Sequence, residues 1–419
     1  MISNSHIQQY AERFGTPLYI YDGAAIETAC TQLRDLLGEG VETVYSIKAN
    51  PNLDVCRLIL GQGLGAEVAS AGELAIALRA GALASRVIAA GPAKSKDDLR
   101  GYVGRGVWLI NVESWNELER LSHAAREAGR RVVVALRINP LHADSGARIR
   151  MSGKASPFGI DEEALWDRLG DYDDLGGVEI GAISVYFGTA ILDAARIIEN
   201  SRKVADLARR LAHRLGRPLQ AVNFGGGFGV PFSDAEEPLD IEQAARGIAR
   251  ICAELRADNF FRTTRFIVES GRYLVATAGR FVCRVQDVKV SRGRHFVIVD
   301  GGIHHNLAAS PLLRFDRKSP RIRLIGRGHE SSEFTTDIVG PLCTTLDCLA
   351  RDVRVRRPEI GDLVVFENAG AYGLSMSPLL FLSHDVPGEV LVMPSGGLFI
   401  RRRRKSVDLL GISDFVETT

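Results

Sequence analysis

The chain has 419 residues, 46% of them hydrophobic and 25% charged, so it can bury a large core, and its length fits two domains or one large barrel with an appendage. Lys and Arg number 52 against 51 Asp and Glu, and this near balance gives no field that would favour nucleic acid or an anionic membrane. Six cysteines without CxxC spacing, no signal-peptide pattern and no long apolar run lead us to expect a soluble cytoplasmic protein in a reducing compartment.

Strand-like and helix-like segments alternate through the first two thirds of the chain. A short strand at 17–22 and a helix at 24–37 come first. Eight apolar runs follow, each closed by turn or polar residues: 43–48, 65–70, 86–91, 107–112, 131–139, 179–188, 219–227 and 265–271. Helix-like sequence between them predicts parallel pairing. Eight such units predict an α/β fold that closes into a (βα)8 TIM barrel over residues 24–275.

The texture changes after residue 276 to β-rich stretches that Gly and Pro interrupt. These stretches lie at 281–290, 295–300, 337–340, 362–367 and 389–394. They predict a C-terminal antiparallel β domain of sandwich or barrel-like form over 276–419. The strand at 17–22 precedes the barrel and lacks a partner in it, so we expect residues 1–23 to contribute that strand to the C-terminal sheet.

Lys48 directly follows the apolar segment Val44–Ile47 and precedes a turn at 50–52. We expect it at the end of a buried strand, where an unpaired ammonium group would be costly. Such a lysine is either a structural cation with a partner or an amine kept for imine formation with a carbonyl cofactor. The residues at the other strand ends decide between these two interpretations.

In a TIM barrel the active site lies at the carboxyl ends of the strands. The residues predicted there are Lys48, Glu67, Asn111, Arg137, Tyr186, Asn223, Glu269 and Arg272, with the glycine run 225–229. The glycine run is either a plain turn or a nest of backbone N–H groups for a phosphate, and its place after strand seven favours a phosphate.

Lys48, the glycine nest and Glu269 together match three chemical groups of pyridoxal 5'-phosphate, which are its aldehyde, its phosphate and its ring nitrogen. Glu269 would keep the ring nitrogen protonated, so that the ring accepts the electrons left behind when CO2 departs. The alternative for Glu269 is a strand-end salt bridge. The sequence therefore predicts pyridoxal 5'-phosphate as the cofactor.

Several motifs extend this prediction over the whole chain. They are YSIKAN (45–50), EVASAGEL (67–74), LRINP (136–140), FGI (158–160), GGGFG (225–229), ESGRY (269–273), GPLCTTLD (340–347) and GAY (370–372). In this order and spacing the chain resembles the fold-type III pyridoxal-phosphate decarboxylases, which have an alanine racemase-like fold and include diaminopimelate, ornithine and arginine decarboxylases. The resemblance implies a homodimeric carboxy-lyase.

The resemblance also implies roles for individual residues. Lys48 would form the Schiff base and Glu269 would meet the ring nitrogen. Cys343 would return a proton to the quinonoid intermediate across a dimer interface, although a buried, inert cysteine is the alternative. The cofactor-binding set is Lys48, Glu67, Arg137, Tyr186, Gly226, Gly227, Glu269, Arg272 and Tyr372, with Tyr372 supplied by the other subunit. The substrate-binding set is Tyr273, Arg314, Asp347 and Tyr372.

Departures from the family pattern bear on the substrate. Tyr186 stands where the family usually has a histidine that stacks on the cofactor. Diaminopimelate decarboxylases carry an arginine-proline segment and an acidic residue after the cysteine, and in this chain these regions read 299–310 and Thr344. The chain most resembles a branch that acts in specialised biosynthesis, including butirosin-type antibiotic pathways, on aminoacyl groups tethered to carrier proteins.

We therefore expect decarboxylation of a carrier-bound aminoacyl group, with free meso-diaminopimelate, lysine or ornithine as the alternative. A racemase is a more distant alternative, because it would place an arginine rather than Glu269 at the ring nitrogen. No metal is expected, since His304 and His305 would face opposite sides of a strand. The basic run 401–405 is either a solvated strand end or a binding patch.

Overall fold

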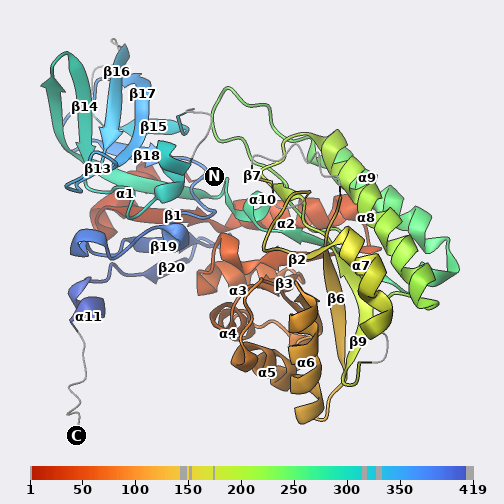
Figure 1. Ribbon diagram of the computed structural model, residues 1–419. Helices are drawn as coiled ribbons and strands as arrows, with labels where there is room; N and C mark the ends of the chain where they lie inside the picture. Colours follow the sequence, from red (N-terminus) through yellow and green to blue (C-terminus); the bar gives the residue numbers. More distant parts are fainter. Residues whose placement is uncertain are drawn as a thin grey trace, which may run out of the picture. The chain divides into compact units, whose positions relative to one another are not determined.

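A computed structural model describes residues 2–141, 149–150, 153–172, 175–313, 319–326 and 333–411 of the chain. The contacts divide the chain into two units, and Figure 1 shows the elements of both. A barrel unit comprises residues 27–231 and 237–274, and a β unit comprises residues 1–26, 232–236 and 275–419.

Eight parallel strands form the closed barrel that the alternating pattern predicts. They are β2 (Val41–Ser46), β3 (Gly65–Val68), β4 (Val87–Ala89), β5 (Leu109–Val112), β6 (Val132–Asn139), β9 (Val178–Ser184), β11 (Ala221–Asn223) and β12 (Arg265–Ser270). The hydrogen-bonded order is β5-β4-β3-β2-β12-β11-β9-β6, and a β5–β6 pairing closes the ring. The predicted (βα)8 barrel is therefore confirmed. The short β8 (Ile160–Asp161) adds to β6, and β7 (Ile149–Arg150) pairs with β10 (Gly188–Thr189).

Side chains from the strands fill the inside of the barrel with apolar atoms. Seven fully or nearly buried residues form this cluster: Val44, Ile88, Leu109, Ala135, Ala182, Ala221 and Ile267. The interior is thus a packed core rather than a pore. Polar side chains are left to the strand ends, where the loops begin.

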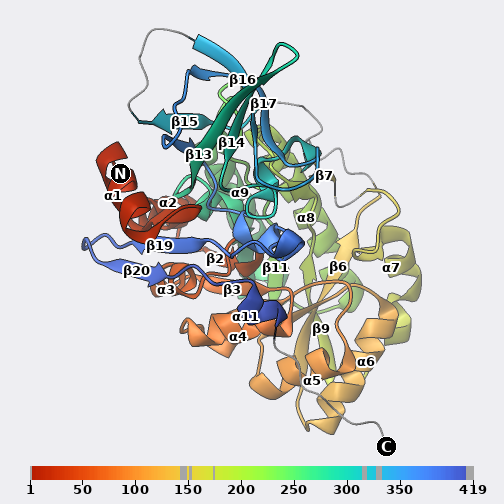
Figure 2. The ribbon, with the colours of Figure 1, turned by 90° about the vertical axis from the view of Figure 1, so that its left-hand side faces the viewer.

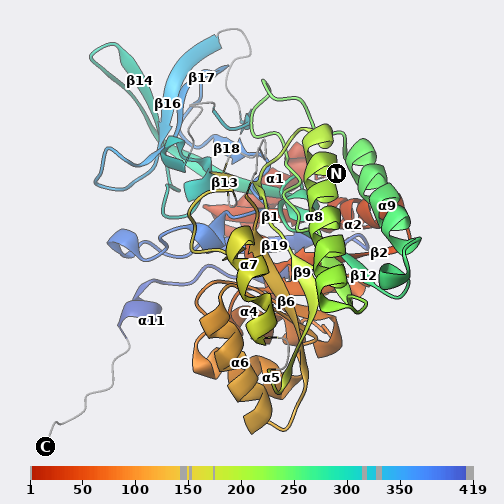
Figure 3. The same cartoon turned by 45° about the vertical axis from the view of Figure 1, so that its right-hand side comes forward.

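The helices of the barrel alternate with its strands. They are α2 (Gly23–Leu37), α3 (Leu53–Gly61), α4 (Ala71–Arg79), α5 (Lys96–Arg105), α6 (Trp115–Glu127), α7 (Glu162–Arg168), α8 (Ala194–Leu215), α9 (Ile241–Arg256) and α10 (Arg272–Val275). Helices α8 and α9 lie side by side on the outside (Figure 3). They approach closely because α9 has a glycine at the contact. A Cβ at Gly247 would lie 2.4 Å from Cγ1 of Ile198.

Short polar side chains fix where several of these helices begin. Ser70, Ser95 and Ser114 accept hydrogen bonds from backbone N–H groups in the first turns of α4, α5 and α6. Asp193 and Asp240 do the same for α8 and α9. Since each cap follows a strand, the caps hold the loops at the carboxyl ends of the strands in place.

The β unit contains a mixed nine-stranded sheet. Its strands are β1 (Leu18–Asp22), β13 (Gly279–Ser291), β14 (Arg294–Val299), β15 (Ile322–Ile325), β16 (Glu333–Val339), β17 (Cys348–Arg356), β18 (Leu363–Phe366), β19 (Gly388–Val392) and β20 (Leu398–Arg401). The order is β17-β16-β14-β13-β1-β19-β20, with β18 also on β13 and β15 on β18. As expected, β1 joins this sheet. The predicted antiparallel β domain is confirmed, although two of its pairings, β1–β19 and β14–β16, are parallel.

Three strands of the β unit were not predicted from the sequence: β15, β17 and β20. Each carries charged residues, and β20 also leaves apolar side chains exposed, so none of them shows the clean alternation of a half-buried strand. The helix α1 (Asn4–Phe14) and the short α11 (Val407–Leu410) also belong to the β unit. Among the described residues, no helix is both long enough and apolar enough to cross a bilayer.

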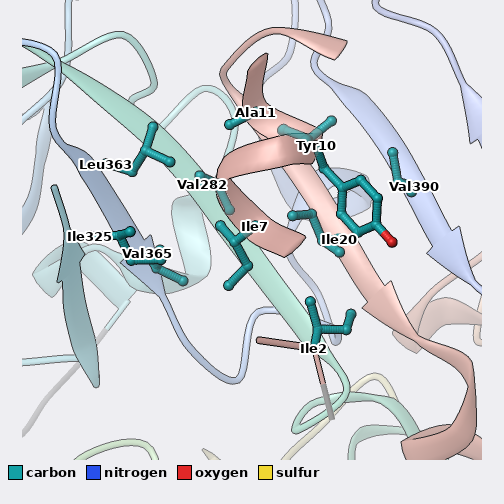
Figure 4. Packing of buried hydrophobic residues seen from close by; sticks show 11 residues of the cluster. Ile2, Ile7, Tyr10, Ala11, Ile20, Val282, Ile325, Leu363, Val365 and Val390 are labelled. Carbon is teal, nitrogen blue, oxygen red and sulfur yellow. The ribbon is translucent and has the colours of Figure 1, made fainter. Parts of the chain in front are cut away.

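A buried apolar cluster holds α1 against the sheet of the β unit (Figure 4). Its eleven residues are Ile2, Ile7, Tyr10, Ala11, Leu18, Ile20, Val282, Ile325, Leu363, Val365 and Val390. They come from α1, from a residue shortly before it and from five strands, so segments far apart in the sequence share one core. Ile20 lies on β1, which pairs with both β13 and β19.

Ile20→Ala should lower the free energy of unfolding of the β unit by about 3 kcal/mol, because it leaves a cavity in this core. Denaturant unfolding followed by tyrosine fluorescence measures the loss. Val290→Ala is the control, since Val290 lies on the neighbouring β13 but is 62% exposed, and it should change stability by less than about 0.5 kcal/mol. Equal effects of the two substitutions would contradict this account of the core.

Candidate active site

Lys48 lies at the carboxyl end of the first barrel strand. Strand β2 ends at Ser46, and Lys48 stands in the single 3-10 turn Ile47–Ala49 that follows. Its Nζ donates to both carboxylate oxygens of Glu67, at 2.9 and 3.0 Å, from the end of β3. The Lys48 side chain is 39% exposed whereas that of Glu67 is 1% exposed. The expectation of a buried lysine was therefore wrong, because the turn carries the amine beyond the strand.

Glu269 is a buried carboxylate on β12, the strand that pairs with β2. Asn223 donates from its side-chain Nδ2 to Oε1 of Glu269 at 2.7 Å. Burial raises the pKa of Glu269 to about 7; the nearby Glu67 also raises it, while Lys48, the Asn223 hydrogen bond and Arg137 lower it. Among the described residues Glu269 has no ion-pair partner, so it is a buried acid that a cation would stabilise.

The glycine run that follows β11 packs against β12, the strand that carries Glu269. The carbonyl oxygen of Gly225 accepts a hydrogen bond from the backbone N–H of Glu269 at 2.7 Å. A Cβ at Gly226 would lie 2.0 Å from the carbonyl oxygen of Glu269, and one at Gly227 would lie 2.4 Å from that of Gly188. Gly227 also has a φ of +101°. Only glycine fits there, so the loop presents bare backbone next to Glu269.

Arg137 is oriented by an acid that the sequence analysis did not single out. Its Nη1 donates to Oε1 of Glu113 at 2.8 Å, and both side chains are largely buried. Glu113 also accepts from the backbone N–H groups of Gly91 and Gly159. It follows β5 directly, two residues beyond the strand-end residue Asn111 that was predicted. The same strand-end rule would have found Glu113 with a slightly wider window.

Tyr186 stands near two cations at this end of the barrel. The ring centroid of Tyr186 lies 5.9 Å from Nζ of Lys48 and 5.9 Å from Cζ of Arg137. An aromatic face attracts cations at such distances. The residue that replaces the usual histidine thus offers an aromatic ring near an amine and a guanidinium group.

A second buried ion pair lies behind Glu113. Lys94 donates to Glu117, and both side chains are at most 2% exposed. Glu117 also accepts from the backbone N–H of Glu113 at 3.3 Å. The ion pair therefore fixes the backbone at Glu113, which in turn holds Arg137.

Arg272 and Tyr273 begin α10, just after β12. The hydroxyl of Tyr273 and Oε1 of Gln32 are hydrogen-bonded at 3.1 Å, and the Tyr273 ring contacts Phe228 edge-on. Burial raises the pKa of Tyr273, so this phenol stays neutral. Its predicted contact with substrate stays a prediction, as does the phosphate contact of Arg272.

Cys343 and Tyr372 belong to the β unit. Cys343 is exposed, which removes the alternative of a buried and inert cysteine. Tyr372 is partly buried and has a φ of +56° in a loop after β18. Cys343 lies in the loop between β16 and β17. Because the residue is exposed, its thiol is accessible for chemistry.

Asp347 closes the loop that carries Cys343. It is buried, and its two carboxylate oxygens accept from the backbone N–H groups of Ile303 and Leu342, each at 2.8 Å. Burial raises its pKa. Its acceptor atoms thus serve the loop, and a substrate contact for Asp347 stays a prediction. Arg314, the remaining predicted substrate ligand, lies outside the described residues.

The expectation that His304 and His305 face opposite sides of a strand was wrong. They lie in a turn after β14, and their ring centroids are only 3.6 Å apart. The ring of His384 is 4.7 Å from that of His304. Burial lowers the pKa of His304 to about 4 and that of His305 to about 2, so both are neutral. Among the described residues, no group of His, Cys, Asp and Glu is arranged to hold a metal ion.

These groups fit pyridoxal 5'-phosphate by their chemistry. Lys48 supplies an accessible amine, Glu269 a buried acid without a cationic partner among the described residues, and Gly226 and Gly227 a backbone cradle that any Cβ would obstruct. All three belong to strand ends or loops of the barrel unit. An aldehyde, a pyridine nitrogen and a phosphate each find a partner of the right type.

Comparison with known proteins assigns the class. Residues 23–276 match the model of the pyridoxal-dependent decarboxylase family, pyridoxal binding domain. The chain belongs to this family: it is a pyridoxal-phosphate-dependent carboxy-lyase of fold type III, as the motifs implied.

Individual relatives extend the match to the whole chain. The L-glutamyl-[BtrI acyl-carrier protein] decarboxylase of Niallia circulans is 39% identical, over 98% of this chain and 96% of the relative. The diaminopimelate decarboxylase of Pseudomonas aeruginosa is 33% identical, over 96% and 94%. Among solved structures, diaminopimelate decarboxylase from Helicobacter pylori complexed with L-lysine has a TM-score of 0.86 at 28% identity, over 97% and 98%.

Glu113→Gln should weaken cofactor binding about tenfold and lower the free energy of unfolding by about 3 kcal/mol, because it leaves the Arg137 cation buried without a counter-charge. Fluorescence titration of the cofactor-free protein with pyridoxal phosphate and denaturant unfolding measure the two effects. Glu127→Gln is the matched control, since Glu127 pairs with Arg100 at 3.0 Å on the exposed surface of α6. Unchanged cofactor affinity in Glu113→Gln would show that Glu113 does not position Arg137 for the cofactor.

The raised pKa of Glu269 predicts a pH dependence in the cofactor-free protein. Folding favours the protonated acid, so this stabilisation is complete below the ordinary pKa near 4.5 and is lost as pH rises through about 7. Relative to Glu269→Gln, the wild type should lose about 3 kcal/mol of unfolding free energy across that window. Denaturant titrations at a series of pH values test this. Parallel stability curves for the two proteins would rule out the raised pKa.

Proposed function

We propose that this enzyme removes the α-carboxylate of an aminoacyl group, glutamyl in the first instance, that is tethered to a carrier protein in specialised metabolite biosynthesis. The observation that carries the proposal is the 39% identity over nearly the full length to the decarboxylase of L-glutamyl-[BtrI acyl-carrier protein], against 30–33% for diaminopimelate decarboxylases. The sequence departs from diaminopimelate decarboxylases at 299–310 and at Thr344, where those enzymes grip the far end of a free substrate.

The proposed roles in the barrel unit follow from the position of each group. Lys48 would bond the aldehyde carbon of the cofactor, with Glu67 accepting from the amine until then. Glu269 would face the ring nitrogen, and Gly226 and Gly227, with Arg272, would hold the phosphate. The bound cofactor supplies an acceptor for the electron pair that CO2 leaves behind.

Glu269 has a specific electrostatic task in this proposal. A cationic ring nitrogen beside it would stabilise the carboxylate and lower its pKa from about 7, so the acid would ionise on cofactor binding. Asn223 would keep the carboxylate aimed through its 2.7 Å hydrogen bond. Tyr186 would offer its ring to the cofactor from between the cations Lys48 and Arg137.

Cys343 is proposed as the acid that returns a proton to the reacting carbon. Its thiol is exposed, and a thiol can donate a proton to a carbanion as a general acid. By the family resemblance, we propose a homodimer in which Cys343 and Tyr372 of one subunit serve the barrel of the other. The carrier protein would be a transient third partner.

Decarboxylation of free meso-diaminopimelate is the second candidate. The diaminopimelate decarboxylases of Pseudomonas aeruginosa and Aquifex aeolicus are 33% and 30% identical to this chain over almost their full lengths. This activity would need groups that bind the distal amino acid of the substrate. Segment 299–310 has Asp300 as its one acid and contains no arginine-proline pair, and Thr344 stands where an acidic residue would follow the cysteine.

The test offers the cofactor-loaded enzyme carrier-bound L-glutamate, free L-glutamate and free meso-diaminopimelate, and follows each by intact mass spectrometry and CO2 release. Only the carrier-bound substrate should lose the mass of CO2. Lys48→Ala should abolish turnover and the visible absorbance of the bound cofactor, whereas Cys343→Ala should keep that absorbance and slow turnover by about 100-fold.

Turnover of free diaminopimelate alone would refute the carrier-bound substrate and establish the second candidate. An unchanged visible absorbance in Lys48→Ala would refute the role of Lys48. Cys348→Ala is the control for Cys343→Ala, because Cys348 lies on the adjacent β17 but is buried with its Sγ against the carbonyl of Ala350. It should leave turnover near the wild-type rate.

A further inference from the structure

The end of the β unit exposes cations that have no acidic partner among the described residues. Strand β20 runs into the basic segment Arg401–Lys405, and every side chain of this segment is exposed. Arg401 pairs with Glu389 at 2.7 Å and Arg403 with Asp385 at 3.3 Å. The side chains of Arg402, Arg404 and Lys405 make no such pair in the part of the chain that the structure describes.

Exposed apolar side chains flank these cations along the chain. Phe399 and Ile400 on β20 are 44% and 40% exposed, and Val407, Leu409 and Leu410 on α11 are 62%, 48% and 50% exposed. Figure 2 shows β20 beside β19, with α11 following along the chain. Arginine together with exposed aromatic and aliphatic groups is the composition of protein interfaces.

A second segment with exposed apolar residues lies next to the basic one. Leu380, Phe381 and Leu382 are 45–48% exposed. The segment after them is tied to the basic run by an antiparallel bridge between Val386 and Arg404. The Ser406 hydroxyl also donates to the carbonyl oxygen of Ser383. We call residues 380–382 and 399–410 together the C-terminal patch.

The C-terminal patch is connected to the loop that carries Cys343 within the same unit. Asp385, which pairs with Arg403, has its carbonyl oxygen 2.9 Å from Nε2 of His305. The turn of His305 begins at Ile303, whose backbone N–H donates to Asp347, the residue that closes the Cys343 loop. A partner seated on the patch would therefore rest on the same framework as the proposed catalytic acid.

We propose that the C-terminal patch is the docking surface for the carrier protein, which binds it through an acidic and partly apolar face. This inference rests on the proposed function, because it names the surface that receives the tethered substrate. Arg402, Arg404 and Lys405 would meet the acidic groups of the carrier, and the exposed aliphatic side chains would be covered around them.

The charge of the patch argues against contact of the patch with itself between two copies of this chain. Such a contact would lie on the two-fold axis and would set each unpaired cation against cations of the other copy. The segment 399–410 has a single acidic residue, Asp408, to offset them. Like charges brought together in an interface oppose association, whereas an acidic partner gains from the same cations.

The experiment compares two substrates with one enzyme. Steady-state kinetics of R402E/R404E/K405E should show KM for the glutamyl-carrier protein raised about tenfold or more, with kcat little changed. KM for a small pantetheine thioester of glutamate should stay as in the wild type, because that substrate needs no docking. Raising the ionic strength should raise the wild-type KM only for the carrier-bound substrate. R402A/R404A/K405A should show a smaller change in the same direction.

R202E/R214E/R250E is the matched control, since it reverses the same number of charges at exposed arginines of α8 and α9. It should leave both KM values unchanged. An unaltered KM for the carrier-bound substrate in R402E/R404E/K405E would overturn the docking surface and leave the proposed function intact. Loss of the dimer in that variant, measured by light scattering, would assign the patch to a second copy. Wild-type enzyme inactive on both thioesters would refute the proposed function, and the docking surface with it.

Discussion

The uneven pairing of buried carboxylates at the carboxyl ends of the barrel strands is the constraint on which the active site depends. Three of these carboxylates belong to Glu67, Glu113 and Glu269. Lys48 neutralises Glu67 and Arg137 neutralises Glu113 at direct hydrogen-bonding distance. Glu269 is left with a neutral amide and more distant cations, so its pKa rises to about 7. A positive charge beside Glu269, such as the protonated pyridine proposed for this position, would stabilise its carboxylate.

Barrel closure is what brings these charges together. Glu67 and Lys48 lie 19 residues apart, whereas Glu269 lies far along the chain, on the last strand. Pairing of β12 with β2 sets Glu269 opposite Val44, two residues before β2 ends. The glycine cradle reaches β12 because only glycine tolerates a carbonyl oxygen 2.0 Å from a Cβ position. The proposed cofactor site therefore depends on backbone register as much as on the side chains.

The sequence predicted the parts of this site that follow from strand periodicity. Counting apolar runs located all eight barrel strands, and their ends located Glu67 and Glu269. The sequence-based prediction failed where local geometry departs from a regular strand. A 3-10 turn leaves the Lys48 side chain partly exposed, and a turn places His304 beside His305. Strand β17 was not predicted, because its charged residues obscure the alternation of apolar and polar positions. Glu113 was missed because it lies beyond its strand.

The two units contain different kinds of functional residue. The groups that match the cofactor, among them Lys48 and Glu269, lie in the barrel unit, where a changed charge would upset a buried network. The departures from diaminopimelate decarboxylases at 299–310 and Thr344 lie in the β unit, as do the exposed Cys343 and the C-terminal patch. Segment 299–310 is mostly buried, so changes there alter the framework on which the Cys343 loop rests and not only the surface of the β unit. Because these departures lie in the β unit, they leave the buried charges of Glu67, Glu113 and Glu269 in the barrel unit unchanged.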